Sequence, residues 1–127
     1  TARKAGVEST ANGRRSYSST PHIGAFNFYV EAGEVALQDI LSSVPKAFLM
    51  TRGMGSGVNS VTGEYSRGAN GLWIENGEIC KPVQEVTIAG DFLNMLQNID
   101  AIGSDLQMRG SSGSPTLRIA EMTLSGI

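Results

Sequence analysis

The stretch Gly71-Leu72-Trp73-Ile74-Glu75-Asn76-Gly77-Glu78-Ile79-Cys80 decides the fold of this chain. Two strand-like runs flank an Asn-Gly pair, which is the strongest short sequence signal for a β-hairpin. A type I′ turn needs positive φ at both central residues, and Asn76 and Gly77 tolerate this conformation better than other residues do. The sequence therefore predicts a hairpin over 71–80 and, with it, a fold built on antiparallel strands.

Further strands and two helices are predicted around the hairpin. Short apolar or alternating runs predict strands over 25–30, 47–51, 83–88, 102–108 and 117–124. Apolar residues at helical spacing predict a helix over 34–43, which Pro45 closes. Asp91 is a suitable N-cap for a second helix, with core-facing side chains at Phe92, Leu93, Leu96 and Ile99. We therefore expect an α+β fold with a mainly antiparallel, twisted sheet and about two short helices.

The N-terminal part differs in character from the rest. Residues 1–6 are typical of the end of a helix, with Gly6 as a left-handed cap. Residues 7–24 are polar and predict a long loop that holds at most a short edge strand. We expect 1–127 to be a single domain in which 1–24 form a flexible segment that leads into it. Because the chain begins with Thr1 and not with Met, we expect it to be part of a longer protein.

Composition excludes several classes of function. The 127 residues carry ten basic and twelve acidic side chains, a net charge of −2, whereas a protein that binds the phosphate backbone of nucleic acid is usually basic. Nucleic acid is therefore an improbable partner. No apolar run approaches the roughly 20 residues needed to cross a bilayer, and no signal peptide opens the chain, so we expect no membrane association.

Metal and thiol chemistry has few candidate residues. A single Cys and a single His exclude an intrachain disulfide and the usual Cys/His zinc cages. His22 lies in a polar loop, where we expect an exposed or hydrogen-bonded imidazole. For Cys80 we expect a half-buried structural thiol, since no His or Asp neighbours it in sequence. The sequence thus predicts no catalytic residue, no metal ligand and no cofactor in this chain.

The tract over 57–71 places hydroxyls, amides and one Arg between glycines, next to the hairpin. Two interpretations stay open. Arg67 and Glu64 form a simple surface ion pair, which contributes little to stability. Alternatively, the glycines leave backbone open for an extended peptide at a sheet edge, and polar side chains hold it. Two adjacent arginines in the N-terminal loop are either solvated or hold a carboxylate. The candidate substrate-binding residues are Asn59, Thr62, Tyr65, Ser66, Arg67, Arg14 and Arg15.

Several motifs of the chain, in their order and spacing, resemble the PmbA/TldD family. They are Gly57-Val58-Asn59, Val61-Thr62-Gly63, Tyr65-Ser66-Arg67-Gly68-Ala69, Trp73 to Ile79, Pro82-Val83, Val86 to Gly90, Gly103-Ser104-Asp105-Leu106, Pro115-Thr116-Leu117 and Met122 to Gly126. They cover most of 45–126. The chain is similar to the C-terminal domain of a PmbA (TldE)-type subunit, in a family also called modulator of DNA gyrase.

The resemblance implies a cytoplasmic pair of proteins in which the TldD-type subunit is a zinc metallopeptidase. The partner of this chain is then a TldD-like subunit or a second copy, and the substrate is a peptide or an unfolded protein. Metal ligands of the TldD type come from a His-Glu-x-x-x-His helix upstream and from a Cys in a loop before the last strands. Neither maps onto this chain, because the loop over 109–115 contains only Arg, Gly, Ser and Pro. The resemblance therefore implies zinc in the partner.

Three functions follow as alternatives. The leading one is the subunit without zinc in a heteromeric metallopeptidase, where it supplies scaffold and one wall of a substrate channel. The second is a protein-interaction module, without enzymatic activity, that modulates DNA gyrase; the net charge of −2 suits contact with protein better than contact with DNA. The third is part of a homodimeric metallopeptidase whose HExxxH motif lies upstream.

Overall fold

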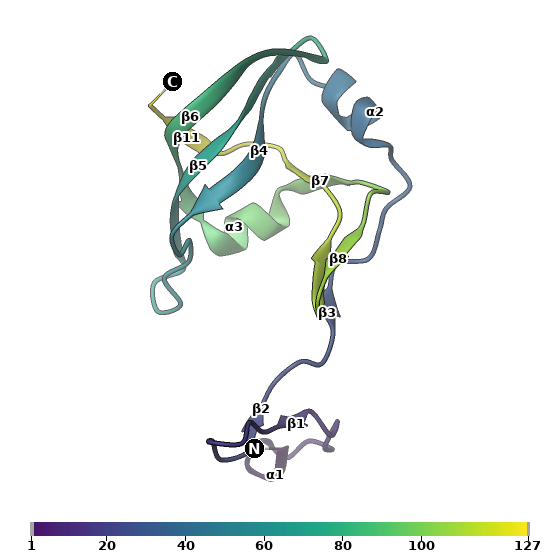
Figure 1. The fold of residues 1–127 in the computed structure, drawn as a ribbon, viewed down its shortest axis with the longest axis vertical. Coiled ribbons are helices and arrows are strands. Elements are labelled where there is room, and N and C mark those ends of the chain that lie inside the picture. Colours follow the sequence, from purple (N-terminus) through teal and green to yellow (C-terminus); the bar gives the residue numbers. More distant parts are fainter. Residues whose placement is uncertain (1, 127) are drawn as a thin grey trace.

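Four antiparallel strands form the main sheet of the structure, a computed structural model that describes residues 2–126 (Figure 1). Along the sheet, the strands follow the order β11-β6-β5-β4. Their bounds are β4 (Lys46–Met54), β5 (Glu64–Glu75), β6 (Glu78–Asp91) and β11 (Thr123–Ser125). One edge of the sheet is therefore the long strand β4, and the other edge is the three-residue strand β11.

The predicted hairpin is confirmed and is longer than expected. Asn76 and Gly77 have φ values of 50° and 82°, as a type I′ turn requires. β6 continues through Pro82, so the separate strand predicted over 83–88 is part of the same strand. The pairing register shifts near Asn70, and Glu85 has a φ of 57°. The Asn70 Oδ1 accepts a hydrogen bond of 2.9 Å from the Glu85 N–H, which satisfies a donor that this bulge leaves unpaired.

The core is built on buried side chains of the two long strands, β5 and β6. Ala69 and Val86 are fully buried and Val83 nearly so. Four partly buried side chains pack against these three: Phe48, Trp73, Ile88 and Leu124. The core thus unites residues from all four strands, and most of its stabilisation comes from apolar area removed from water.

Both predicted short helices are present, and a third short helix lies where the end of a helix was predicted over residues 1–6. They are α1 (Ala2–Ala5), α2 (Leu37–Ser42) and α3 (Phe92–Gln97). The Asp91 carboxylate caps α3 as predicted, because it accepts a hydrogen bond of 2.9 Å from the Asn94 N–H. The prediction that Leu93 and Leu96 face the core is wrong, since both are exposed. They lie three positions apart on the outer face of a helix that turns Met95 toward the sheet side.

Two small sheets complete the body. β7 (Ile99–Ile102) pairs with β10 (Leu117–Ile119), and β9 (Ser112–Ser114) lies between β3 (Phe28–Tyr29) and β8 (Gln107–Arg109). The strands predicted over 102–108 and 117–124 are therefore each divided into two. The first is interrupted because the Asp105 side chain bonds to Thr116, which holds 103–106 in a turn. The strand predicted over 25–30 shrinks to β3, which has only the short β9 as a partner.

Residues 2–26 lie apart from the body at one end of the molecule (Figure 1). There α1 is followed by Gly6, whose φ of 65° confirms the predicted left-handed cap. β1 (Gly13–Arg14) pairs antiparallel with β2 (His22–Ile23). We call residues 2–26 the N-terminal arm. None of the helices over residues 2–126 has the length and apolar character needed to span a membrane.

Candidate functional site

The connection between β4 and β5 is a loop that its own side chains organise. The Asn59 Oδ1 accepts hydrogen bonds from the backbone N–H groups of Val61 and Thr62, at 3.0 and 3.4 Å. The Thr62 hydroxyl donates to the Glu64 carboxylate at 3.2 Å. Asn59 and Thr62 therefore fold the loop, and their polar atoms are engaged within it.

Tyr65 and Arg67 lie two positions apart on β5 and so share one face of the sheet. Both side chains lie over glycines. A Cβ at Gly57 would come within 2.6 Å of the Tyr65 ring, and a Cβ at Gly53 would overlap the Arg67 guanidinium. The two glycines thus make room for these side chains, which is a reason for glycine at both positions.

Arg67 lacks the partner that one interpretation gave it. Among the described residues it forms no ion pair with Glu64, whose carboxylate instead accepts the hydrogen bond from Thr62. The Arg67 Nε is buried and has no hydrogen-bond partner within residues 2–126. Buried donors are rarely left unpaired, so this orphaned N–H marks the Arg67 side chain as a candidate for contact with a group outside residues 2–126.

The backbone of the glycine-rich tract is not open to a peptide, as the second of the two interpretations required it to be. β5 pairs with β6 along its whole length and with β4 from Gly68 onward. The remaining part is covered by the loop, where the Ser66 N–H donates to the Gly57 carbonyl at 2.9 Å. The open edge belongs to β4, since no described strand pairs with its outer side. β5 is central because the loop folds back, a long-range effect that local sequence does not reveal.

A cavity of 1220 Å³ lies against the main sheet and extends to this open edge. Residues 46–50 of β4 line it together with side chains of the other three strands, and much of its wall is apolar. The opposite wall comes from the stretch 112–122, which carries β9 and β10. A strand edge with unpaired N–H and C=O groups, next to an apolar hollow, can bind an extended chain by backbone hydrogen bonds and by pockets for alternate side chains.

Two groups of polar contacts hold the opposite wall in place, and the sequence analysis did not predict them. Arg118 forms a two-pronged ion pair with Asp100, at 2.6 and 3.0 Å, and also donates to the Ser43 hydroxyl at the end of α2. The hydrogen bonds from Arg118 lower the pKa of Asp100. Hydrogen bonds from Thr116 likewise lower the pKa of Asp105. The motifs containing Asp105 and Thr116 were recognisable, but their pairing across eleven residues was not.

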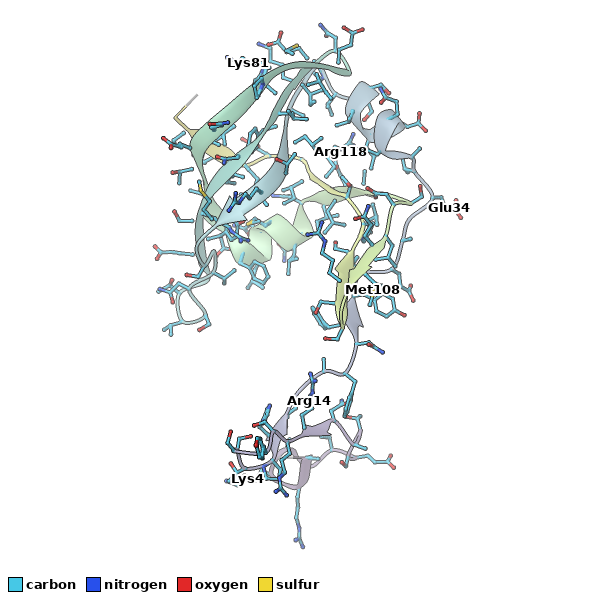
Figure 2. The ribbon with its side chains drawn as sticks, in the orientation of Figure 1. Lys4, Arg14, Glu34, Lys81, Met108 and Arg118 are labelled. Atoms are coloured by element: carbon cyan, nitrogen blue, oxygen red, sulfur yellow. The ribbon has the colours of Figure 1, made fainter. Side chains whose placement is uncertain are left out.

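The seven candidate substrate-binding residues do not form one site. Asn59, Thr62, Tyr65, Ser66 and Arg67 come together in the loop and the start of β5. Arg14 and Arg15 lie in the N-terminal arm, well away from them, as Figure 2 shows for Arg14. Arg14 is engaged there, because it donates to the Ala25 carbonyl at 2.7 Å and lies 5.4 Å from the centre of the Phe26 ring. The seven residues share a polar chemistry suited to a peptide, but the fold separates the two N-terminal arginines from the other five.

Potential metal ligands are scattered over the described part of the chain. Within residues 2–126 no three His, Cys, Asp or Glu side chains lie close enough to hold a metal ion. His22 is exposed on β2, as expected. Cys80 is exposed and not half-buried, which corrects our prediction. It is the third residue of β6, close to the turn of the hairpin. The described donors therefore do not fit a zinc site.

Comparison with known proteins places these features in a family context. The chain matches the PmbA/TldA metallopeptidase C-terminal domain over residues 1–126. It is 38% identical over 109 residues to metalloprotease PmbA of Escherichia coli O157:H7, which covers 85% of this chain and 24% of that protein. It is 30% identical, over an alignment of 141 residues, to a metalloprotease TldD homologue of Buchnera aphidicola subsp. Acyrthosiphon pisum, covering 98% of this chain and 29% of that one.

A solved structure agrees in fold. The crystal structure of a Thermotoga maritima MSB8 protein that bears the name of a DNA gyrase modulator superposes with a TM-score of 0.85 and 32% identity. The superposition covers 98% of this chain and 28% of the Thermotoga chain. The chain thus spans about a quarter of the length of the curated relatives that it matches.

Proposed function

This chain belongs to the PmbA/TldA metallopeptidase family through its C-terminal domain, and we propose that it is a PmbA-type subunit of a TldD/PmbA metallopeptidase assembly acting on unfolded or extended peptides. Its partner is a TldD-like subunit or a second copy, and the pair works in the cytoplasm. Zinc belongs to the partner, since the described donors of this chain do not group into a metal site. The higher identity to a PmbA than to a TldD homologue, 38% against 30%, supports the PmbA type.

One observation carries the assignment of substrate: the Arg67 guanidinium lies against Gly53 near the end of the open β4 edge, and its buried Nε has no partner within residues 2–126. A guanidinium stays charged at any working pH and presents five donors in a rigid fork. It is therefore suited to a peptide carbonyl or to a chain-terminal carboxylate. Tyr65, on the same face and lining the cavity, supplies a ring and a hydroxyl beside it.

The open edge explains why the substrate should be unfolded. An extended peptide has unpaired N–H and C=O groups that can add to the outer side of β4, whereas a folded strand already has its backbone paired. Backbone recognition of this kind tolerates many side chains. The role of this subunit is then to position the peptide, and bond cleavage takes place at the partner's metal.

The proposal is tested by purifying the chain within its longer parent, alone and with a TldD-like partner. We expect zinc and cleavage of an unfolded peptide only when the partner is present, and no cleavage of the same sequence held in a stable fold. Zinc and full activity in the parent alone would contradict the assignment and favour a homodimeric metallopeptidase with an upstream HExxxH motif.

A second function rests on the name of the Thermotoga maritima relative, that of a DNA gyrase modulator. In this alternative the chain contacts the topoisomerase itself, and its net charge of −2 suits a protein partner. A pull-down with purified gyrase subunits, together with a supercoiling assay in the presence of the parent protein, distinguishes the two. Binding and altered supercoiling without any peptide cleavage would favour gyrase modulation.

A further inference from the structure

Two bulges interrupt the main sheet at one level, on either side of Asn70 in β5. On the β4 side, Met50 pairs with Gly71, and Gly53 pairs with Ala69. β4 therefore takes three steps where β5 takes two, and the extra residue bends the strand at this point. Because side chains alternate between the two faces of a strand, one extra residue also moves every later side chain of β4 to the opposite face.

The second bulge lies on the β6 side. Val83 and Val86 pair with the same two residues of β5, so that β6 also takes three steps against two. Glu85, which lies between them, has a φ of 57°, a left-handed conformation that residues with a side chain rarely adopt. Both valines are nevertheless buried in the same core, which their spacing of three would not permit in a regular strand. The packing of the core thus requires this bulge.

Asn70 is hydrogen-bonded to both bulges. Its Oδ1 accepts a hydrogen bond of 2.9 Å from the Glu85 N–H, and its backbone carbonyl accepts one of 3.2 Å from the Thr51 hydroxyl. Thr51 is the residue of β4 that the pairing with β5 passes over. A side chain without an acceptor at position 70 would leave the Glu85 N–H without its partner. Asn70 therefore holds the two bulges in place.

The bulge on β4 decides which residue lies beneath the Arg67 guanidinium. Arg67 comes two positions before Ala69 on β5, so the two side chains share one face of the sheet. Gly53 pairs with Ala69 and has no Cβ, and a Cβ at this place would overlap the guanidinium. Without the extra residue, the pairing would bring Arg52 to the position of Gly53. The side chain and the positive charge of Arg52 would then both displace Arg67.

We propose that Asn70 is a positioning residue for peptide binding: by holding the two bulges it keeps Gly53 beneath Arg67, and so sets the guanidinium beside the open edge of β4. The inference rests on the proposed function, in which Arg67 holds the peptide. Asn70 acts through Arg67 and without touching the peptide. Peptide binding should therefore depend on Asn70 when Arg67 is present, and not when it is absent.

The test measures kcat and KM for an unfolded peptide with the assembled complex of the parent protein and its TldD-like partner. Asn70→Leu removes the acceptor at nearly constant volume. We expect KM to rise about fivefold or more and kcat to stay within about twofold of the wild type, because bond cleavage takes place at the partner's metal. Asn70→Asp keeps an acceptor for the Glu85 N–H and should bring KM back to within about twofold. The same change at an exposed residue of α3, Asn94→Leu, is the matched control and should leave both constants unchanged.

A double-mutant cycle with Arg67→Ala decides whether Asn70 acts through the guanidinium. In the Arg67→Ala complex, Asn70→Leu should change KM by less than about twofold, because coupled positions do not add. Full additivity of the two losses would overturn the inference. So would an Asn70→Asp variant as weak as Asn70→Leu, or a wild-type KM in a folded Asn70→Leu complex. If Asn70→Leu fails to fold, Thr51→Val removes the other hydrogen bond at nearly constant shape and should also raise KM; a wild-type KM for that variant would overturn the inference.

Crystal structures of the parent protein separate this inference from the proposed function. We expect the Arg67 guanidinium to leave Gly53 in the Asn70→Leu variant and to lie over it again in Asn70→Asp. A guanidinium that stays over Gly53 in Asn70→Leu would overturn the positioning role, whatever the peptide turnover. A displaced guanidinium with normal peptide turnover would instead contradict the substrate site of the proposed function, while the dependence of Arg67 on Asn70 would stand.

Discussion

Asp105 accepts two hydrogen bonds from Thr116, one from the backbone N–H at 2.8 Å and one from the hydroxyl at 2.7 Å. The contact ties the turn over 103–106 to the start of β10 and so fixes the wall of the cavity that faces β4. The Asp105 carboxylate also lies close to the backbone of Gly103, where an added Cβ would collide with it. The wall is therefore held by a charged group whose protonation should matter for stability.

Stability should fall in acid partly through Asp105. The Thr116 hydrogen bonds lower its pKa in the folded state, so the unfolded chain takes up a proton first as pH falls. The stabilisation that Asp105 contributes is fully present above the ordinary pKa of a carboxyl group, which is near 4. It is lost as the pH falls from that value toward the lowered pKa of the folded state. Asp105→Asn should cost about 1 kcal/mol at pH 7 and make the fall in melting temperature below about pH 5 shallower. Melting curves from pH 7 to pH 3 check this, with the exposed Glu34→Gln as control; identical slopes for Asp105→Asn and the wild type would contradict it.

Gly77→Val should cripple folding. Gly77 has a φ of 82°, which β-branched residues resist, and an added Cβ would lie 2.8 Å from the Ser42 Cα in α2. We expect a loss of more than about 2 kcal/mol, measured by urea unfolding. Gly13→Val is the control, since that position in β1 has negative φ and open space around it. Equal stability of the two variants would mean that the turn does not constrain the hairpin.

Arg67→Ala should impair peptide turnover without unfolding the subunit. Loss of a guanidinium that holds the peptide should lower kcat/KM of the assembled complex by about tenfold or more, or about 1.4 kcal/mol of transition-state stabilisation. Melting temperature and co-elution with the partner should be nearly unchanged. Gly53→Ser, which pushes a side chain into the guanidinium, should act in the same direction. Lys81→Ala, on β6 opposite Trp73 and six positions along β5 from Arg67, is the control.

A different result would reveal a structural role for Arg67. If it only braces β4 and β5, the variant loses stability or assembly, and the complex that remains cleaves at the normal rate. Measuring all three quantities on one preparation separates the two roles.

The isolated chain should hold no stoichiometric zinc after dialysis. His22 and Cys80 lie on separate elements, β2 and β6, and three protein ligands are the usual minimum for a tightly held zinc ion. Elemental analysis checks this directly. One zinc per chain, lost on His22→Ala or Cys80→Ser, would contradict the prediction and identify the ligands.

Local sequence signals predicted local structure well. The Asn76-Gly77 turn, the Asp91 cap of α3 and the Gly6 cap of α1 each depend on a residue and its near neighbours, and all three are confirmed. The family resemblance, carried by the motifs over 45–126, is confirmed by the match over residues 1–126. The antiparallel pairing of the strands could be predicted from the hairpin signal and from the number of short strands.

Features that depend on distant contacts were missed. The strand predicted over 102–108 breaks because Asp105 reaches Thr116, and no local pattern encodes that contact. One interpretation placed an open sheet edge at the glycine-rich tract. In the structure the open edge belongs to β4, because the loop over 55–63 folds back on β5. Leu93 and Leu96 have helical spacing suited to a core, yet the six-residue helix α3 has only one face against the sheet.

The exposed thiol of Cys80 has a chemical consequence of its own. With one cysteine per chain, oxidation to a disulfide between two of these chains can only join two molecules, through the start of β6 in each. That covalent pair would hold the two β5–β6 turns close together, at the opposite end of the molecule from α1 (Figure 1). A maleimide reagent gives a single attachment site for a fluorophore at that tip.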